Sequence, residues 1–292
     1  MTIGRCVAAL VLFGVFVVTP LTAQRDNPWN LKAPWVPWDT RGTDPFQRHP
    51  PFKIFDDVYY VGLHGVSAYL INTTGGMALL DATYPETANF VLDSVRRLGF
   101  QPTDIKYVFV SHAHGDHSGG AARIQKETGA RVGMSAEDWD LHERGSPASA
   151  LKRDLVIKDG DTITLGATVF KFYVSPGHTP GSLTVEYPVY DRGKRYRTLS
   201  PGGLGLNFGP QWTAKYIQSV ERLKHLGPFE VLLPNHPFMT PGGLFQLSRD
   251  LEKPRPAGVH PLAIGPATIN AFLDAALKVA REKLAAEQQA RP

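Results

Sequence analysis

Short apolar runs alternate with amphipathic segments along the chain from about residue 52 onward. Several runs are rich in β-branched and aromatic residues and are bounded by Gly, Asn or Thr, a pattern that predicts strands. These runs are VYYVGL (58–63), SAYLINTT (67–74), MALLDA (77–82), YVFV (107–110) and RVGM (131–134). Between them, residues 85–100 carry apolar side chains at helical spacing that end at Gly99, and residues 118–130 form a second predicted helix that ends at Gly129.

The second half of the chain repeats this alternation. Its predicted strands are TVFKFYVS (168–175), SLTVEYPVYD (182–191), RYRTL (195–199) and EVLLP (230–234). Amphipathic helices are predicted at residues 214–227 and 267–290. Because strands and helices alternate in two halves with no linker between them, we expect one α/β domain in which two sheets are sandwiched between helical layers.

The N-terminus has the layout of a secretory signal peptide. Arg5 precedes an apolar run of thirteen residues, CVAALVLFGVFVV, and TPLTAQ follows with Ala23 suited to cleavage. The run is too short to span a bilayer comfortably, although an uncleaved N-terminal anchor is the alternative. We therefore expect residues 1–23 to be removed on export to a bacterial periplasm, with a fully extracellular fate as the alternative, and the rest of the chain to be soluble.

Composition limits the chemistry that the exported chain can perform. The 292 residues are 42% apolar and 20% charged, as in a globular domain, and the formal charge of +4 includes no run of Lys or Arg that could follow a nucleic-acid backbone. Cys6, the only cysteine, lies inside the predicted signal peptide. The exported protein would therefore have no disulfide, no thiolate metal ligand and no cysteine nucleophile, so its chemistry must come from His, Asp and Ser.

Residues 24–48 are rich in Pro and Trp and lack periodicity. We interpret them as an extended arm that lies over the domain and is anchored by Trp29, Trp35 and Trp38, with a partly ordered leader as the alternative. The predicted organisation is thus a signal peptide (1–23), an N-terminal arm (24–48) and one folded domain (49–292).

Three histidines and an aspartate crowd into residues 112–117, HAHGDH, directly after an apolar strand. His112 and His114 stand at i and i+2, so in extended backbone their side chains point the same way and can converge on one cation. Asp116 and His117 follow at a glycine turn and reach a neighbouring ion more easily than the same one. A polar loop without a metal rarely carries four ligand-type side chains so tightly, and we interpret the motif as a metal site.

Two further histidines follow predicted strands between turn residues, His178 in SPGHTPGS and His236 in LLPNHPF. Catalytic zinc usually binds three protein ligands and a water, so six ligands divide into two sets. The predicted sets are His112, His114 and His178, and Asp116, His117 and His236. Imidazole and carboxylate without thiolate suit zinc, with iron or manganese as alternatives, and we expect two zinc ions per chain.

The ordered motifs LLDATYP, SHAHGDH, SPGHTPGS and LLPNHPF resemble those of the metallo-beta-lactamase superfamily. The resemblance runs from about residue 52 to the end of the chain. It implies a metallo-beta-lactamase-like hydrolase domain with four layers, an αβ/βα sandwich, and a di-zinc site at one edge. It also implies that Asp81, in LLDATYP, braces the metal ligands from outside, where such groups fix ligand orientation. A turn residue at a strand end is the alternative for Asp81.

The interval between His178 and His236 separates the branches of this superfamily. Many relatives, among them glyoxalase II, lactonases and RNA-processing nucleases, have an aspartate there that bridges both ions. Here the strand RYRTLSPGG has no carboxylate, and Asp191 lies in a predicted hairpin tip. Ser200, the secretion signal, the Trp/Pro arm and the C-terminal segment are similar to the third subclass of class B beta-lactamases, whereas GGLGLNFGPQW does not match the substrate-facing loop expected of an established lactamase.

The resemblance implies a zinc-dependent hydrolase that opens the β-lactam ring of antibiotics by attack of a zinc-bound hydroxide, with Asp116 as the catalytic residue that orients it. The alternatives are an exported di-zinc hydrolase of another ester, lactone or thioester, and a non-catalytic protein that keeps the fold. Ser182, Ser200 and Asn207 are candidates for hydrogen bonds to substrate, with ordinary loop roles as the alternative. We expect a monomer that acts on a small molecule and contacts neither nucleic acid nor, after signal cleavage, a membrane.

Overall fold

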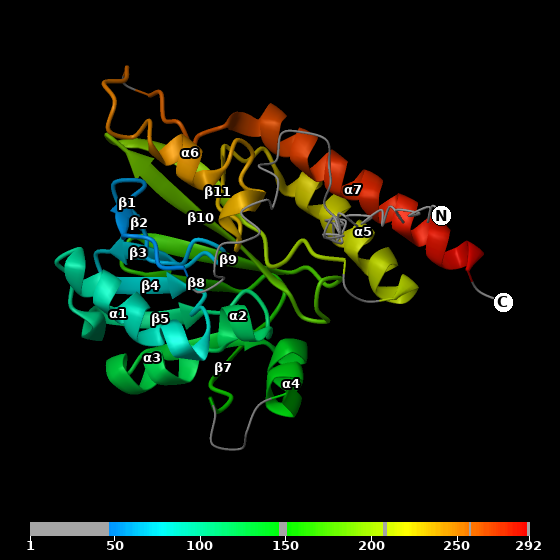
Figure 1. Ribbon diagram of the computed structural model, residues 1–292, viewed down its shortest axis with the longest axis horizontal. Coiled ribbons are helices and arrows are strands. Elements are labelled where there is room, and N and C mark those ends of the chain that lie inside the picture. The colour runs from blue at the N-terminus through cyan, green and yellow to red at the C-terminus, as the bar shows by residue number, and fades with distance from the viewer. Residues whose placement is uncertain (1–46, 146–150, 207–208, 257, 291–292) are drawn as a thin grey trace, which may run out of the picture.

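The computed structural model describes residues 47–145, 151–206, 209–256 and 258–290, which build two β-sheets with helices on their outer faces (Figure 1). The first sheet has the strand order β1-β2-β3-β4-β5-β6-β7, and the second has the order β12-β11-β10-β9-β8. The strands of the first sheet are β1 (Phe52–Lys53), β2 (Val58–Tyr60), β3 (Tyr69–Thr73), β4 (Gly76–Leu80), β5 (Ile105–Phe109), β6 (Arg131–Ser135) and β7 (Leu155–Ile157). Those of the second are β8 (Thr162–Leu165), β9 (Thr168–Val174), β10 (Leu183–Asp191), β11 (Lys194–Ser200) and β12 (Val231–Leu232).

The first sheet changes from antiparallel to parallel pairing at β4. Strands β1 to β4 pair antiparallel, and β4 to β7 pair parallel. Parallel neighbours require a crossover connection, and helices usually supply it. Here α1 (Ala88–Arg97), α3 (Ala121–Thr128) and α4 (Ala136–Gly145) lie between successive parallel strands. The carboxyl ends of these strands therefore meet at one edge of the sheet.

The second sheet is antiparallel from β8 to β11, and β12 pairs parallel with β11. The connection from β11 to β12 runs through α5 (Pro210–Leu226), and the C-terminal helix α7 (Gly265–Gln289) packs beside α5 on the outer face of this sheet (Figure 1). Because β9, β11 and β12 run in one direction, their carboxyl ends share an edge of the sheet.

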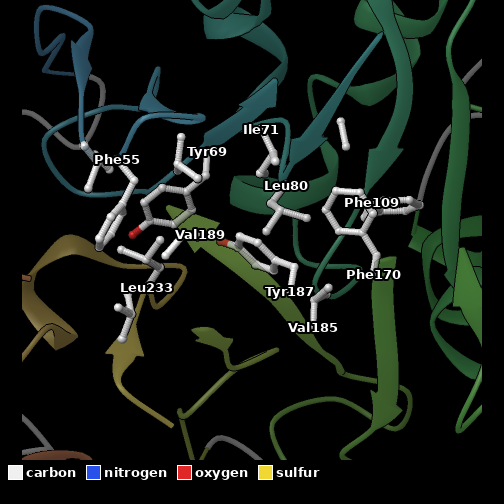
Figure 2. Packing of buried hydrophobic residues seen from close by; sticks show 14 of the residues in the cluster. Phe55, Tyr69, Ile71, Leu80, Phe109, Phe170, Val185, Tyr187, Val189 and Leu233 are labelled. Atoms are coloured by element: carbon white, nitrogen blue, oxygen red, sulfur yellow. The ribbon is translucent and has the colours of Figure 1, made fainter. Parts of the chain in front are cut away.

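Three apolar clusters fill the spaces between the layers. In the central cluster, Tyr69, Leu80 and Phe109 of the first sheet face Phe170 and Tyr187 of the second (Figure 2). A second cluster joins the first sheet to α1 and α3, and a third joins the second sheet to α5 and α7. Helix, sheet, sheet and helix therefore form four layers, which confirms the predicted αβ/βα sandwich.

The helix predicted at residues 118–130 is divided into two. A single-turn helix, α2 (Gly115–Ser118), comes first, and α3 begins only at Ala121. The N–H of Gly120 donates to the carbonyl oxygen of Thr83 at 3.0 Å, outside any helix, and this bond interrupts the helical ladder. The division holds α2 against the loop that follows β4.

The sequence patterns missed two helices, α4 and α6 (Leu244–Ser248), and the short strands β1, β7 and β8. In α4 the buried face is made by Asp138, Trp139 and His142, so two of its three buried side chains are polar. A search for apolar side chains at helical spacing cannot detect such a helix.

The predicted signal peptide (1–23) and the predicted arm, apart from its last two residues, lie outside the described part of the chain. Of those two residues, Arg48 forms an isolated bridge with Leu63. Among the described residues, no helix combines the length and the hydropathy needed to cross a membrane.

Candidate metal centre

All the predicted metal ligands lie beyond strand ends at one edge of the two sheets, Asp116 and His117 in the single-turn helix α2 and the other four in loops. The HAHGDH stretch follows β5, His178 lies in the connection between β9 and β10, and His236 follows β12. The carboxyl ends of these strands bring together loops that are more than a hundred residues apart, as the contact between His117 and His236 shows.

His112, His114 and His178 face one another and form the histidine set. Their ligand nitrogens all lie within 4.8 Å of one another, and His112 Nε2 is 3.1 Å from His178 Nε2. The ring centroid of His114 is 4.8 Å from that of each partner. His112 and His178 are buried and His114 is half-buried. The structure thus brings the first predicted set together.

Asp116, His117 and His236 form the mixed set. His117 Nε2 lies 3.1 Å from Asp116 Oδ2 and 3.3 Å from His236 Nε2, and His236 Nε2 lies 3.8 Å from Asp116 Oδ2. His112, Asp116 and His117 also offer ligand atoms within 4.8 Å of one another. The ring of His112 therefore lies between the two sets, which adjoin.

Hydrogen bonds on the far side of the rings orient the histidines. Nδ1 of His178 donates to the carbonyl oxygen of Gly205 at 2.7 Å, and Nδ1 of His236 donates to that of Gly65 at 2.9 Å. Because a carbonyl only accepts, a neutral ring here carries its proton on Nδ1 and turns the Nε2 lone pair toward the centre. Burial lowers the pKa of His178 to about 3 and that of His236 to about 4, so both rings are neutral at physiological pH.

The spacing and chemistry of these donors fit zinc. Tetrahedral zinc with Zn–N bonds of about 2.0–2.1 Å separates two imidazole nitrogens by about 3.3 Å. The two Nε2 pairs in this centre are 3.1 Å and 3.3 Å apart. Two lone pairs that face each other at such a distance, as those of His112 and His178 do, repel unless a cation lies between them. Imidazole and carboxylate ligands without a thiolate are also a donor set that zinc accepts.

Asp81 braces both sets from behind. Its Oδ2 accepts hydrogen bonds from His117 Nδ1 and from Ser111 Oγ, each at 2.9 Å, and Ser111 Oγ lies 3.0 Å from His112 Nδ1. The backbone of Asp81 has a φ of 62°, a strained conformation for a residue other than glycine. Strain of this kind is typical of functional sites, where the surrounding structure maintains it. These contacts match the bracing position predicted for Asp81.

The mixed set favours a positive charge at its centre. Burial by itself would lower the pKa of His117, but the carboxylates of Asp116 and Asp81 raise it to about 10. Burial likewise acts to raise the pKa of Asp116, yet the facing charge of His117 holds it well below its usual range. The two carboxylates therefore stabilise a cation between them, whether a proton or a metal ion supplies the charge.

Comparison with known proteins agrees with this geometry. The model of a family described as the metallo-beta-lactamase superfamily matches residues 61–192. A hydroxyacylglutathione hydrolase of Fuscovulum blasticum is 30% identical over an alignment that covers 65% of this chain and 69% of the relative. The chain belongs to the metallo-beta-lactamase superfamily. As predicted from the motifs, it is a hydrolase with the fold of that superfamily.

Solved structures of the superfamily superpose on most of the chain. A subclass B3 metallo-beta-lactamase of Bradyrhizobium japonicum is 27% identical, with a TM-score of 0.73 over 84% of this chain and 97% of that chain. The metallo-beta-lactamase SMB-1, solved in a complex with mercaptoacetic acid, is 26% identical, with a TM-score of 0.73 over 84% of this chain and 100% of that chain. The structural similarity to these metallo-beta-lactamases therefore extends over nearly their whole length.

Among the described residues, the interval between His178 and His236 brings to the centre no counterpart of the carboxylate that bridges two ions in many superfamily members. The interval between His178 and His236 contains four acidic residues, and each is engaged elsewhere. Asp191 lies at the β10–β11 hairpin tip, as predicted, and its oxygens accept from Arg255 at 2.6 and 2.7 Å. Glu186 and Glu221 accept from the guanidinium groups of Arg197 and Arg281, and Glu230 accepts the backbone N–H of Arg197.

The stretch after β11 presents bare backbone to the histidine set instead. A Cβ at Gly203 would lie 2.5 Å from Cδ2 of His178, and the φ of this residue is +149°. Only glycine fits such a position, because both the close approach and the backbone conformation exclude a side chain. Position 203 therefore offers no side chain that could bind a metal ion.

The predicted substrate contacts lie in different surroundings. Ser182 is 0% exposed, and its Oγ bonds to Thr179 Oγ1 at 2.6 Å. Ser200 is 8% exposed, its Oγ lies 3.1 Å from the hydroxyl of Tyr187, and it lines a cavity of about 20 Å³ behind the centre. Both serines thus bond within the protein, which favours their structural alternative. Asn207 lies outside the described residues.

Three side chains that the sequence did not single out adjoin the centre. Tyr84 and Phe238 are half-buried. The Phe238 ring lies 5.1 Å from that of His236. Burial, together with the charge of Asp116, raises the pKa of Tyr84. Asp138 is 1% exposed and accepts hydrogen bonds from both loops of the histidine set. Tyr84 and Phe238 lie within the quoted motifs LLDATYP and LLPNHPF, so their proximity to the ligands was a usable signal.

Proposed function

We propose that the protein is an exported zinc-dependent hydrolase that opens the β-lactam ring. One observation carries the proposal: the interval between His178 and His236 brings no carboxylate to the centre, because its acidic side chains accept hydrogen bonds elsewhere, three from arginine side chains and Glu230 from a backbone N–H. The bridging aspartate of glyoxalase II and similar enzymes is therefore missing. Similarity to subclass B3 metallo-beta-lactamases over nearly their entire length supports the same choice.

The residues of the centre have distinct tasks in this reaction. The two ligand sets would each hold one zinc ion, and zinc supplies a hydroxide nucleophile near neutral pH and an electrophile for the carbonyl oxygen. Asp116 carries its negative charge at all physiological pH values, so its carboxylate can orient the nucleophile and accept its proton at Oδ1 or Oδ2. The half-buried rings of Tyr84 and Phe238 border the centre and suit the apolar part of a substrate.

Hydrolysis of a thioester is the second candidate. The observation in its favour is the sequence similarity to hydroxyacylglutathione hydrolases, which reaches 30% identity over 65% of this chain. The same neutral imidazoles and the same aspartate would serve both reactions, since each consists of water attack on an acyl carbon.

Export is part of the proposal and rests on the N-terminal sequence. Arg5, the thirteen apolar residues and Ala23 have the order of a signal peptide. N-terminal sequencing of protein recovered from a periplasmic fraction should begin at Gln24. A chain that keeps Met1 and sediments with membranes would contradict export in soluble form.

Substrate assays decide between the two reactions. The purified zinc-loaded protein is tested with a penicillin, a carbapenem, a lactone and a glutathione thioester of a hydroxy acid, with and without a chelator. We expect chelator-sensitive opening of at least one β-lactam, with a higher kcat/KM than for the thioester. Turnover of the thioester alone would overturn the β-lactam proposal, and β-lactam turnover that survives both the chelator and the His112→Ala substitution would overturn the metal mechanism.

A further inference from the structure

One buried carboxylate connects the two loops that carry the histidine set. Asp138 Oδ2 accepts the backbone N–H of Ala113 at 2.9 Å, between His112 and His114. The same oxygen accepts from Thr179 Oγ1 at 2.7 Å, next to His178. Oδ1 accepts the backbone N–H of Gly181 at 2.8 Å. Asp138 thus bonds to the immediate chain neighbours of all three histidines and lies 1% exposed.

The start of α4 holds Asp138 in this position. Ser135 Oγ accepts the backbone N–H of Asp138 at 3.2 Å, which caps the helix and fixes its first turn. The helix N-terminus also stabilises a carboxylate there. On the other side, a Cβ at residue 181 would lie 2.0 Å from Ser135 Oγ and 3.0 Å from Asp138 Oδ1, so Gly181 lets the loop of His178 lie directly against the helix.

The hydrogen bonds around Asp138 have only one consistent direction. The carboxylate only accepts, so the Thr179 hydroxyl must give its proton to Asp138. Ser182 Oγ therefore donates to Thr179 Oγ1 at 2.6 Å, and it accepts the Thr179 backbone N–H at 3.1 Å. The network assigns Ser182 a place in the support of the histidine set.

We infer that Asp138 is a positioning residue that fixes the distance between the His112–His114 loop and the His178 loop, and thereby sets the zinc affinity of the histidine set. It has no contact of this kind with the mixed set, whose outer bonds go to Asp81 and to the carbonyl of Gly65. Removal of the carboxylate should therefore weaken one ion and spare the other. The inference rests on the zinc use of the proposed function, but not on its substrate.

The test measures zinc binding directly, by competition with a chromophoric chelator and without any substrate. In Asp138→Asn, one oxygen is replaced by an NH2 group, which cannot accept the backbone N–H of Ala113 or of Gly181 that the oxygen accepted. We expect the zinc affinity of the histidine set to fall by about 10–100-fold, the usual effect of losing a group that orients ligands. The affinity of the mixed set should stay at its wild-type value.

A second background and a control variant show which ligand set loses zinc affinity. In His236→Ala, which weakens the mixed set, Asp138→Asn should lower the affinity of the remaining ion as much as it does in the full protein. The matched control is Asp154→Asn, because Asp154 also accepts a backbone N–H, from Val132 at 2.9 Å, at the end of β6 remote from Ser135. Asp154→Asn should leave both zinc affinities unchanged.

A second pair of variants covers the case in which Asp138→Asn does not fold. Thr179→Val removes the hydroxyl that bonds to Asp138, and Thr179→Ser keeps it. We expect Thr179→Val to lower the zinc affinity of the histidine set. Thr179→Ser should keep that affinity at its wild-type value. Equal loss of both ions, or wild-type affinity of the histidine set in Asp138→Asn or Thr179→Val, would overturn the inference. Because no substrate is present, failure of β-lactam hydrolysis would not produce either result.

Discussion

The two ligand sets, although they adjoin, differ in charge and in bracing. The histidine set contains three imidazoles whose pKa values burial lowers, and backbone groups and Asp138 hold its loops. In the mixed set, the carboxylate of Asp116 faces the imidazole of His117, whose pKa is raised. Asp81 supports that imidazole directly through a hydrogen bond. Three ligands on each side thus do not make two equivalent sites. One set is ready to accept a cation, whereas the other must first release a proton.

The largest contrast should come from removal of one histidine on each side. His112 adjoins both sets, so His112→Ala should lower kcat/KM by on the order of a thousandfold, or ~4 kcal/mol. His236→Ala removes a ligand from the mixed set alone and should leave measurable turnover. Steady-state kinetics and metal analysis of both zinc-supplemented variants test this; equal losses of activity and metal would show that the division into two sets is wrong.

Substitution of Asp81 should weaken zinc binding mainly in the mixed set, whereas substitution of Asp138 should weaken it in the histidine set. Asp81→Asn cannot accept all three hydrogen bonds of the carboxylate, because an NH2 group would replace either the oxygen that accepts from His117 and the Ser111 hydroxyl or the oxygen that accepts the Ser111 backbone N–H. We expect the mixed set to lose about 10–100-fold in zinc affinity and the histidine set to lose less, because Asp81 reaches His112 only through Ser111. Competition with a chelator measures both affinities. A greater loss in the histidine set would refute the bracing assigned to Asp81.

Binding of the second zinc ion should release about one proton per chain near neutral pH, because His117 is charged before it ligates. Calorimetry in buffers of different ionisation enthalpy measures that proton. Release of none would contradict the raised pKa of His117.

The proton on His117 should also make the stability of the metal-free protein depend on pH. The pKa of His117 in the folded protein, about 10, lies above the ordinary histidine value of about 6.5 that holds in the unfolded chain, so folding favours the protonated ring. This contribution is complete below pH 6.5 and is lost as the pH rises toward 10. Denaturant titrations of the metal-free protein across this range should show falling stability, and the fall should be smaller in His117→Gln.

The smallest effects should come from the serines. Ser200→Ala removes a hydroxyl that bonds to Tyr187 inside the protein, and we expect kcat/KM to change by no more than about threefold. Ser182→Ala should act through zinc affinity rather than through the chemical step. A rapid-quench search should find no acyl-enzyme, since water attacks directly. A covalent intermediate trapped on Ser182 or Ser200 would disprove the mechanism for any substrate.

The sequence determined the parts of this protein that depend on local spacing. Alternating apolar runs predicted the longer strands of both sheets, and the i, i+2 spacing of His112 and His114 after a strand predicted that they converge. The isolated histidines His178 and His236 were detectable because strands and turn residues surround them. The order of these motifs was enough to predict the four-layer fold, which the three clusters of the core confirm.

Only the tertiary structure decided what surrounds the ligands. Spacing along the chain could not reveal that Asp138 joins the loops of His112 and His178, since 25 residues separate it from Ala113 and 41 from Thr179. Nor could it show that Asp191 and Glu186 bind arginines, that Gly203 lies against His178, or that Ser182 faces inward. Hydrogen-bond partners and burial depend on which loops meet at the sheet edge, and that is set by the pairing and packing of strands distant in sequence.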